Sequence, residues 1–151
     1  MIQKDMVNEI RRTAQRIEKA FPRTATPFPE WEVCETIHNF TERYGKDFFA
    51  LFWPRMHDDF QVTRFLFPFM MEYFLTDEVT ADSGLTADLF IGTLDPVAQK
   101  EVQKDFALDK LSASLTREQR SVVCEWLHVM KKKDDLLVNV ENAIAYWCQT
   151  R

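Results

Sequence analysis

The sequence contains very little glycine, with only 3 such residues among 151. The tight turns of β-sheets need backbone conformations with positive φ, which glycine adopts more readily than any other residue. A β-sandwich or β-barrel built from this chain would lack residues for its turns. The low glycine count therefore favours helices joined by a few loops. A chain of this length also buries enough surface to fold without a metal or a disulfide.

Long hydrophobic runs and a regular cysteine pattern are missing as well. The most apolar run covers residues 65–71, whereas a membrane-spanning helix needs about 20 apolar residues. The N-terminal segment has an acid at Asp5 and no apolar run, so it does not resemble a signal peptide. Cys34, Cys124 and Cys148 are odd in number and far apart, unlike the disulfide framework of a secreted protein. We therefore expect a cytoplasmic protein, in a reducing compartment, with no membrane span.

The sequence lacks the common catalytic motifs too. It has no Gly-x-Ser-x-Gly elbow, no glycine-rich phosphate loop and no His-Glu-x-x-His pair. The segment from His57 to Asp59 resembles the His-Asp pair of metal phosphohydrolases, but His38 and His128 have no matching Asp neighbours. A formal net charge of −5 argues against direct binding of nucleic acid. We predict no catalytic residues and no enzymatic activity.

Apolar residues recur every three or four positions along most of the chain, which is the pattern of amphipathic helices. The expected helices cover residues 3–21, 30–43, 46–53, 59–75, 95–111, 116–133 and 137–149. Pro68 either kinks the helix in which it lies or starts a new one. The sequence thus predicts a single all-α domain over residues 1–151, a compact bundle of six or seven helices with one short extended segment near residues 89–94.

Local signals mark several helix ends. Asp95 and Pro96 form a typical helix start, with Asp as the N-cap and Pro at the first helical position. Thr116 and Gln119 have the spacing of a capping box. Pro54 is expected to end the helix that begins near residue 46.

Four short blocks, in a fixed order along most of the chain, resemble a known group of proteins. They are Ile17-Glu-Lys-Ala-Phe21, Phe65-Leu-Phe-Pro-Phe-Met70, Leu115-Thr-Arg-Glu-Gln-Arg120 and Ala145-Tyr-Trp147. Together they resemble an uncharacterised family of small, all-helical bacterial proteins. The resemblance implies a helical fold and a bacterial source. It implies no activity, because each block is a packing or capping feature.

Aromatic and acidic residues are concentrated in the middle of the chain. Residues 44–75 hold 11 of the 20 aromatic residues, and residues 57–95 hold eight acids against the single base Arg64. The aromatic segment is either a central, covered hairpin or an exposed docking patch rimmed by carboxylates. The second alternative suits a basic protein partner. Its candidate partner-binding residues are Trp53, Asp58, Asp59, Phe67, Phe69, Glu72, Asp77 and Glu78.

Two Cys-x-x-x-His pairs are candidates for metal binding. Cys34 and His38 form one pair, and Cys124 and His128 form the other. Residues four apart lie on the same face of a helix, so each pair offers a thiolate and an imidazole side by side. Two such helices packed together would complete a tetrahedral zinc site. The ordinary alternative is that these are small core cysteines and histidines at the core edge.

The leading functional hypothesis is a non-enzymatic protein-binding module. A small, acidic, helical, bacterial protein fits an immunity or inhibitor protein that neutralises a basic effector such as a nuclease. The alternative is a small-ligand or metal-binding regulatory protein, which would use an apolar pocket in the aromatic segment or the Cys/His pairs. Neither hypothesis predicts the oligomeric state.

Overall fold

A computed structural model describes residues 4–22, 31, 36–44, 48–76, 83–101, 108–133 and 140–149. These residues form nine α-helices and no β-strand, which confirms the all-α class. The helices are α1 (Lys4–Ala20), α2 (Ile37–Tyr44), α3 (Phe48–Asp58), α4 (Phe60–Thr76), α5 (Ser83–Thr93), α6 (Pro96–Glu101), α7 (Leu108–Ser114), α8 (Arg117–Lys133) and α9 (Glu141–Trp147). No described helix is long and apolar enough to cross a membrane.

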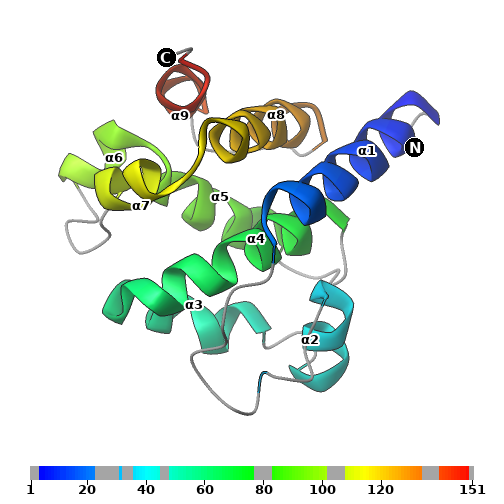
Figure 1. The fold of residues 1–151 in the computed structure, drawn as a ribbon, viewed down its shortest axis with the longest axis horizontal. Coiled ribbons are helices and arrows are strands. Elements are labelled where there is room, and N and C mark those ends of the chain that lie inside the picture. The colour runs from blue at the N-terminus through cyan, green and yellow to red at the C-terminus, as the bar shows by residue number, and fades with distance from the viewer. Residues whose placement is uncertain are drawn as a thin grey trace.

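Helix α4 lies in the middle of the molecule (Figure 1). Helix α1 packs against both α4 and α8, and α9 packs against α8. Helices α2 and α3 pack against α4 from the other side, so α2 and α8 lie on opposite sides of it. The central position of α4 places its side chains in contact with both halves of the bundle.

The sequence of α4 explains why it lies at the centre. Apolar side chains surround this helix instead of forming one stripe, and a helix that is hydrophobic all round must be covered all round. Its buried apolar residues are Val62, Phe65, Leu66, Phe67, Phe69, Met70, Met71, Tyr73, Phe74 and Leu75. Of the two alternatives for the aromatic segment, the covered arrangement is confirmed for this helix.

Proline does not end α3, which corrects one sequence prediction. Pro54 lies inside α3 and Pro68 lies inside α4, so Pro68 does not start a new helix either. A proline in a helix interior costs about 3 kcal/mol, because it removes a backbone hydrogen bond and crowds the preceding turn. Burial of Phe49 and Phe52 before Pro54 offsets this cost, since both rings join the core through α3.

The extended segment predicted near residues 89–94 is also wrong, because α5 continues to Thr93. Ala87, Phe90, Ile91 and Leu94 are buried, whereas Leu89 is exposed. Asp88 and Thr93 are buried as well, so burial does not alternate along this segment as it would along a half-buried strand. The single helix predicted over residues 95–111 is replaced by α6 and α7, with residues 102–107 outside the described part.

Both predicted helix starts are confirmed by their hydrogen bonds. The Oδ1 atom of Asp95 accepts from the backbone N–H groups of Val97 and Ala98, at 2.8 and 3.3 Å. At the start of α8, the backbone N–H of Thr116 donates to Oε1 of Gln119 at 2.9 Å. The N–H of Gln119 donates in return to Oγ1 of Thr116 at 3.1 Å. This reciprocal pair is the capping box that the spacing predicts.

Candidate functional site

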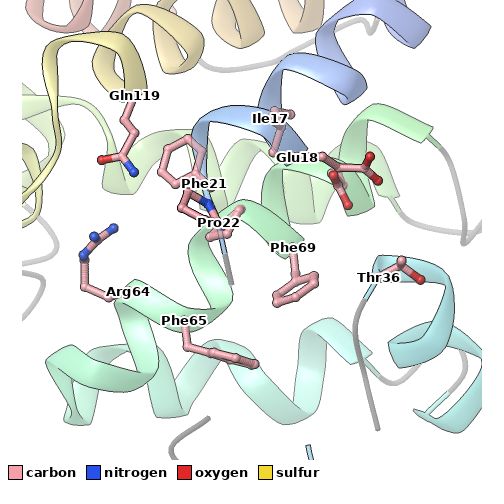
Figure 2. A pocket seen from close by; sticks show the side chains of 11 residues that line it. Ile17, Glu18, Phe21, Pro22, Thr36, Arg64, Phe65, Phe69 and Gln119 are labelled. Atoms are coloured by element: carbon pink, nitrogen blue, oxygen red, sulfur yellow. The ribbon is translucent and has the colours of Figure 1, made fainter. Parts of the chain in front are cut away.

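A cavity of about 300 Å³ opens where the end of α1, the middle of α4 and the starts of α2 and α8 meet. We call it the α1–α4 groove (Figure 2). Its lining residues are Ile17, Glu18, Phe21, Pro22, Thr36, Arg64, Phe65, Pro68, Phe69, Glu72 and Gln119. The volume lies at the lower end of the range for small-molecule sites, which are typically apolar with a few placed polar groups.

One face of α4 forms the floor of the groove. Arg64, Phe65, Pro68, Phe69 and Glu72 all line it, and their spacing puts them on one side of a helix. The floor is therefore a row of rings and one proline, with a cation near its beginning and a carboxylate near its end.

The aromatic walls are held in place by rings behind them. Phe65 stacks on Trp31 with ring centres 5.6 Å apart, and Phe69 meets Phe40 edge-on at 4.9 Å. Trp31 and Phe40 are both fully buried. Such pairs restrict ring rotation and add about 0.5–1.5 kcal/mol each beyond their buried area. The groove thus has a fixed apolar wall and does not depend on a loose side chain to form it.

Charged groups of opposite sign lie at the two sides of the groove. Figure 2 shows Arg64 on one side and Glu18 on the other, with Phe21 and Phe69 between them. Glu72 also lines the groove and is only 6 % exposed. Desolvation by burial lowers the pKa of the Arg64 guanidinium from its usual value. A molecule in the groove would meet two carboxylates, a guanidinium and apolar rings.

Helix ends position the polar rim. The amide of Gln119 belongs to the capping box of α8, and its Nε2 atom donates to the carbonyl oxygen of Ala20 at 2.9 Å. Thr36 precedes α2, where its Oγ1 accepts from the N–H of Asn39 at 3.2 Å. The side chain of Asn39 accepts from the N–H of Thr36 at 3.1 Å in return. Both rim residues therefore stand in fixed places at helix N-termini.

The predicted aromatic anchors do not form a surface patch. Phe67 is fully buried and contacts Phe90 and Trp147, so it belongs to the core. Trp53 is half-buried and stacks on Phe49 at 5.1 Å. Phe69 is 9 % exposed and faces the groove. The physical reason is the position of α4, which has helices on both sides.

Among the predicted acidic anchors, only Glu72 and Asp59 have described side chains. Glu72 lines the groove, as stated above. Asp59 is exposed and lies just before α4, where its Oδ1 accepts from the N–H of Gln61 at 2.8 Å. The side chain of Asp58 and the residues Asp77 and Glu78 lie outside the described part of the chain.

The structure divides the predicted zinc ligands between two sides of α4. His38 is exposed on α2, where its Nε2 atom lies 3.7 Å from the Glu42 carboxylate. Cys124 and His128 lie on α8, beyond α4 (Figure 1). Cys34 lies outside the described residues. The structure therefore does not bring His38 to the pair on α8.

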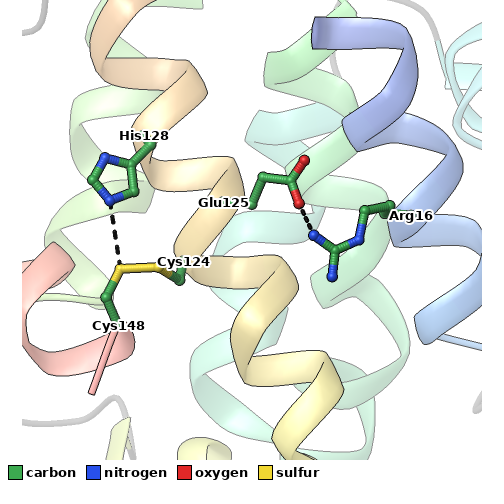
Figure 3. The surroundings of a disulfide bond; sticks show 5 residues. All are labelled: Arg16, Cys124, Glu125, His128 and Cys148. Atoms are coloured by element: carbon green, nitrogen blue, oxygen red, sulfur yellow. Dashed lines mark hydrogen bonds and ion pairs between the residues drawn. A yellow bond between two sulfur atoms is a disulfide. The ribbon is translucent and has the colours of Figure 1, made fainter. Parts of the chain in front are cut away.

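A different partner lies next to Cys124 and His128. Cys148, which follows α9, forms a disulfide with Cys124 across 24 residues, with Cα atoms 5.0 Å apart (Figure 3). The Nε2 atom of His128 lies 3.7 Å from Sγ of Cys148. The two sulfur atoms and a ring nitrogen of His128 all lie within 4.8 Å of one another. This disulfide differs from our expectation of reduced, unconnected cysteines, because sequence spacing does not show that α9 folds back onto α8.

Sequence reasoning did not single out most of the residues that line the groove. Glu18 and Phe21 at the end of α1 lie about 100 residues before Gln119 and meet it only in the folded protein. One signal was present, because Arg64 is the only base among residues 57–95 and lies, with Glu72, in a helix that is mostly apolar. A charged side chain in such a helix marks a place where the core opens to water or to a ligand.

Comparison of the chain with protein family models, with curated proteins and with solved structures gives no match. The resemblance to a bacterial family therefore stays a prediction. Function has to be argued from the α1–α4 groove and from the cysteine–histidine cluster, because a fold class alone carries no activity.

Proposed function

We propose that this protein is a non-catalytic binding protein, and that the α1–α4 groove holds a small molecule with an apolar centre and a cationic amine. The observation that carries the proposal is the composition of the groove. It combines fixed aromatic walls with the carboxylates of Glu18 and Glu72. The sequence suggested a small-ligand-binding regulatory protein as an alternative function, and the groove is the apolar pocket that such a protein would use.

The charges of the groove favour an amine over an acid. Two carboxylates line it against the single guanidinium of Arg64. An ammonium group placed near Glu72 would gain charge-assisted hydrogen bonds in a partly desolvated site. An apolar ring would fill the space between Phe21, Phe65 and Phe69. A second, anionic group on the ligand would find Arg64 at the opposite side.

Titration with matched probes tests this proposal. Phenethylamine, phenethyl alcohol and phenylpropionate share an aromatic ring and differ in charge. We expect the amine to shift the backbone NMR signals of residues 64–72 at lower concentration than the other two probes. Equal affinity for all three probes, or shifts that avoid α4, would refute the proposal.

Variants make the titration specific to the groove. Glu72→Gln keeps the size of the side chain and removes its charge, and should weaken binding of the amine roughly tenfold. Glu42→Gln is the matched control, because Glu42 is an exposed acid on α2 that does not line the groove. Phe69→Leu should weaken all three probes alike, because it removes a shared apolar wall.

A basic protein partner is the second candidate, since two of the predicted partner-binding residues, Phe69 and Glu72, line the groove. The side chain of a lysine or arginine has the same chemistry as the proposed ligand: an apolar stem and a cationic end. A partner would reach Glu72 only by inserting such a side chain, because Glu72 is buried. Co-purification with the product of the adjacent gene tests this candidate. It is supported if Glu72→Gln lowers recovery of the partner and Glu42→Gln does not.

A further inference from the structure

Two cysteines and a histidine converge where α8 meets the C-terminal end of α9. Cys124 and His128 are one helical turn apart on α8, and Cys148 comes from the end of α9. This is the one cluster of three metal-ligating side chains within the described ranges. It uses residues that the proposed function leaves without a role.

We propose that Cys124, His128 and Cys148 form a zinc site when the disulfide is reduced, so that the disulfide and the metal exclude each other. Both forms use the same two sulfur atoms. The disulfide ties them to each other, and zinc would tie each of them to the metal. The three residues thus form a metal site between α8 and α9 that is available only when the disulfide is reduced.

The distances suit zinc without movement of the helices. Bond lengths of about 2.0 to 2.3 Å in a tetrahedral site place neighbouring ligand atoms about 3.5 to 3.8 Å apart. The Nε2 atom of His128 already lies 3.7 Å from Sγ of Cys148. The two sulfur atoms have to separate, and Sγ of Cys124, which lies within 4.8 Å of the ring nitrogen of His128, has to approach it. Side-chain rotation supplies both movements. Three protein ligands leave the fourth position of the tetrahedron to water.

Contacts other than the disulfide hold α9 against its neighbours, so we expect the ligands to stay together after reduction. Ala143 and Trp147 are buried, and the indole N–H of Trp147 donates to the carbonyl oxygen of Leu94 at 3.0 Å. At the other end of α9, Glu141 forms an ion pair with Lys131 of α8. His128 is exposed, and both cysteines are partly exposed, so reductant and metal can reach the site.

The chemistry balances with one dithiol and one zinc ion. The dithiol gives two electrons and two protons to the disulfide, which becomes two thiols, and the dithiol itself becomes a disulfide. Zinc then bonds to both sulfur atoms and to neutral His128, and the two thiol protons are released to water. An external disulfide reverses the reaction: it takes two electrons from the zinc-bound thiolates and two protons from water and becomes a dithiol. The two thiolates form the protein disulfide again and release zinc.

Metal titration of the full chain in its two redox states tests this proposal. We expect the protein reduced with a phosphine to bind about one Zn²⁺ ion per chain, measured by competition with a chromophoric chelator. Cobalt substitution should give the absorption of a tetrahedral site with thiolate ligands. The oxidised protein should bind no Zn²⁺ at this affinity. Absence of binding by the reduced protein, or equal binding in both states, would overturn the proposal.

Variants separate this site from the other ligand set that the sequence suggests. His128→Asn keeps the disulfide and should lower zinc affinity by more than the roughly 10- to 100-fold typical for loss of an outer-shell partner. Cys148→Ser should abolish the cobalt–thiolate absorption of a two-cysteine site, with helical circular dichroism as the check on folding. Cys34→Ser is the matched control and should bind zinc as the wild type does. Loss of binding in Cys34→Ser with retention in His128→Asn would contradict the assignment.

Discussion

Single tryptophan side chains join helices that are far apart in the sequence. The indole N–H of Trp126 on α8 donates to the carbonyl oxygen of Met71 on α4 at 2.8 Å, and the Trp126 side chain is fully buried. Trp147 makes the equivalent bond from α9 to Leu94. A buried indole needs such a partner, because an unsatisfied buried donor costs about 1–3 kcal/mol. The two tryptophans therefore fix which backbone segments face each other.

Replacing Trp126 with Phe should lower the free energy of unfolding by about 1–3 kcal/mol. The change removes a hydrogen bond and leaves a small cavity in a close-packed core. The loss can be measured by urea unfolding, as a lower midpoint with the same dependence of the unfolding free energy on urea concentration. Trp53→Phe, at a half-buried position, is the comparison and should cost clearly less. Equal costs for the two variants would contradict the role given to Trp126.

Tyr73 gives the protein a specific alkaline sensitivity. It is buried on α4, and desolvation raises the pKa of its hydroxyl above the usual value of about 10. Between the unfolded and folded pKa values, the unfolded chain loses this proton and the folded chain keeps it. The free energy of unfolding therefore falls as pH rises above about 10.

Chemical denaturation at a series of pH values checks this prediction for Tyr73. The wild type should lose stability more steeply than Tyr73→Phe as pH rises through this range. Tyr44→Phe is the matched control, since it removes a hydroxyl from a half-buried tyrosine, and should follow the wild type. Parallel curves for the wild type and Tyr73→Phe would show that Tyr73 does not carry the effect.

At the scale of the helices, the start of α8 both caps this helix and joins it to the end of α1. Gln119 closes the capping box with Thr116 and also donates to the carbonyl oxygen of Ala20 at the end of α1. The same two helices are tied further along by Glu125, which accepts from Thr13 at 3.1 Å and forms an ion pair with Arg16. One rim of the α1–α4 groove is therefore set by how α8 starts.

Two alanine variants separate capping from the contact between α1 and α8. Thr116→Ala should cost about 1 kcal/mol, the usual value for a lost cap. Gln119→Ala should cost more, because it also leaves the Ala20 carbonyl without this donor. Thermal unfolding of both variants, with the exposed position Ser121→Ala as control, measures the difference. If Gln119→Ala were no worse than Thr116→Ala, the bond between the two helices would be irrelevant to stability.

Helix type and most helix starts follow from local sequence, because capping and apolar spacing are local properties. The capping box at Thr116 and the N-cap at Asp95 were predicted correctly for this reason. The behaviour of Pro54 was not, because the burial that offsets its cost comes from packing against α4. The segment near residues 89–94 was predicted to be extended, because a short apolar run does not distinguish a strand from a buried helix.

At the scale of the whole molecule, the two candidate sites depend on which helices meet. The α1–α4 groove combines residues from Ile17 to Gln119, and the disulfide joins Cys124 to a residue 24 positions later. Spacing along one helix predicted that Cys124 and His128 are neighbours. It could not predict that Cys148 lies beside them or that His38 lies on the other side of α4. Which helices pack against each other is determined by tertiary structure, and it cannot be inferred from residue spacing in a single sequence.

The most direct test of the central claim is a crystal structure of the protein grown with phenethylamine. We predict density for the amine in the α1–α4 groove, with its ring between Phe21 and Phe69 and its ammonium group within hydrogen-bonding distance of Glu72. A groove that is filled by the protein's own side chains, or an amine bound only elsewhere on the surface, would contradict the account.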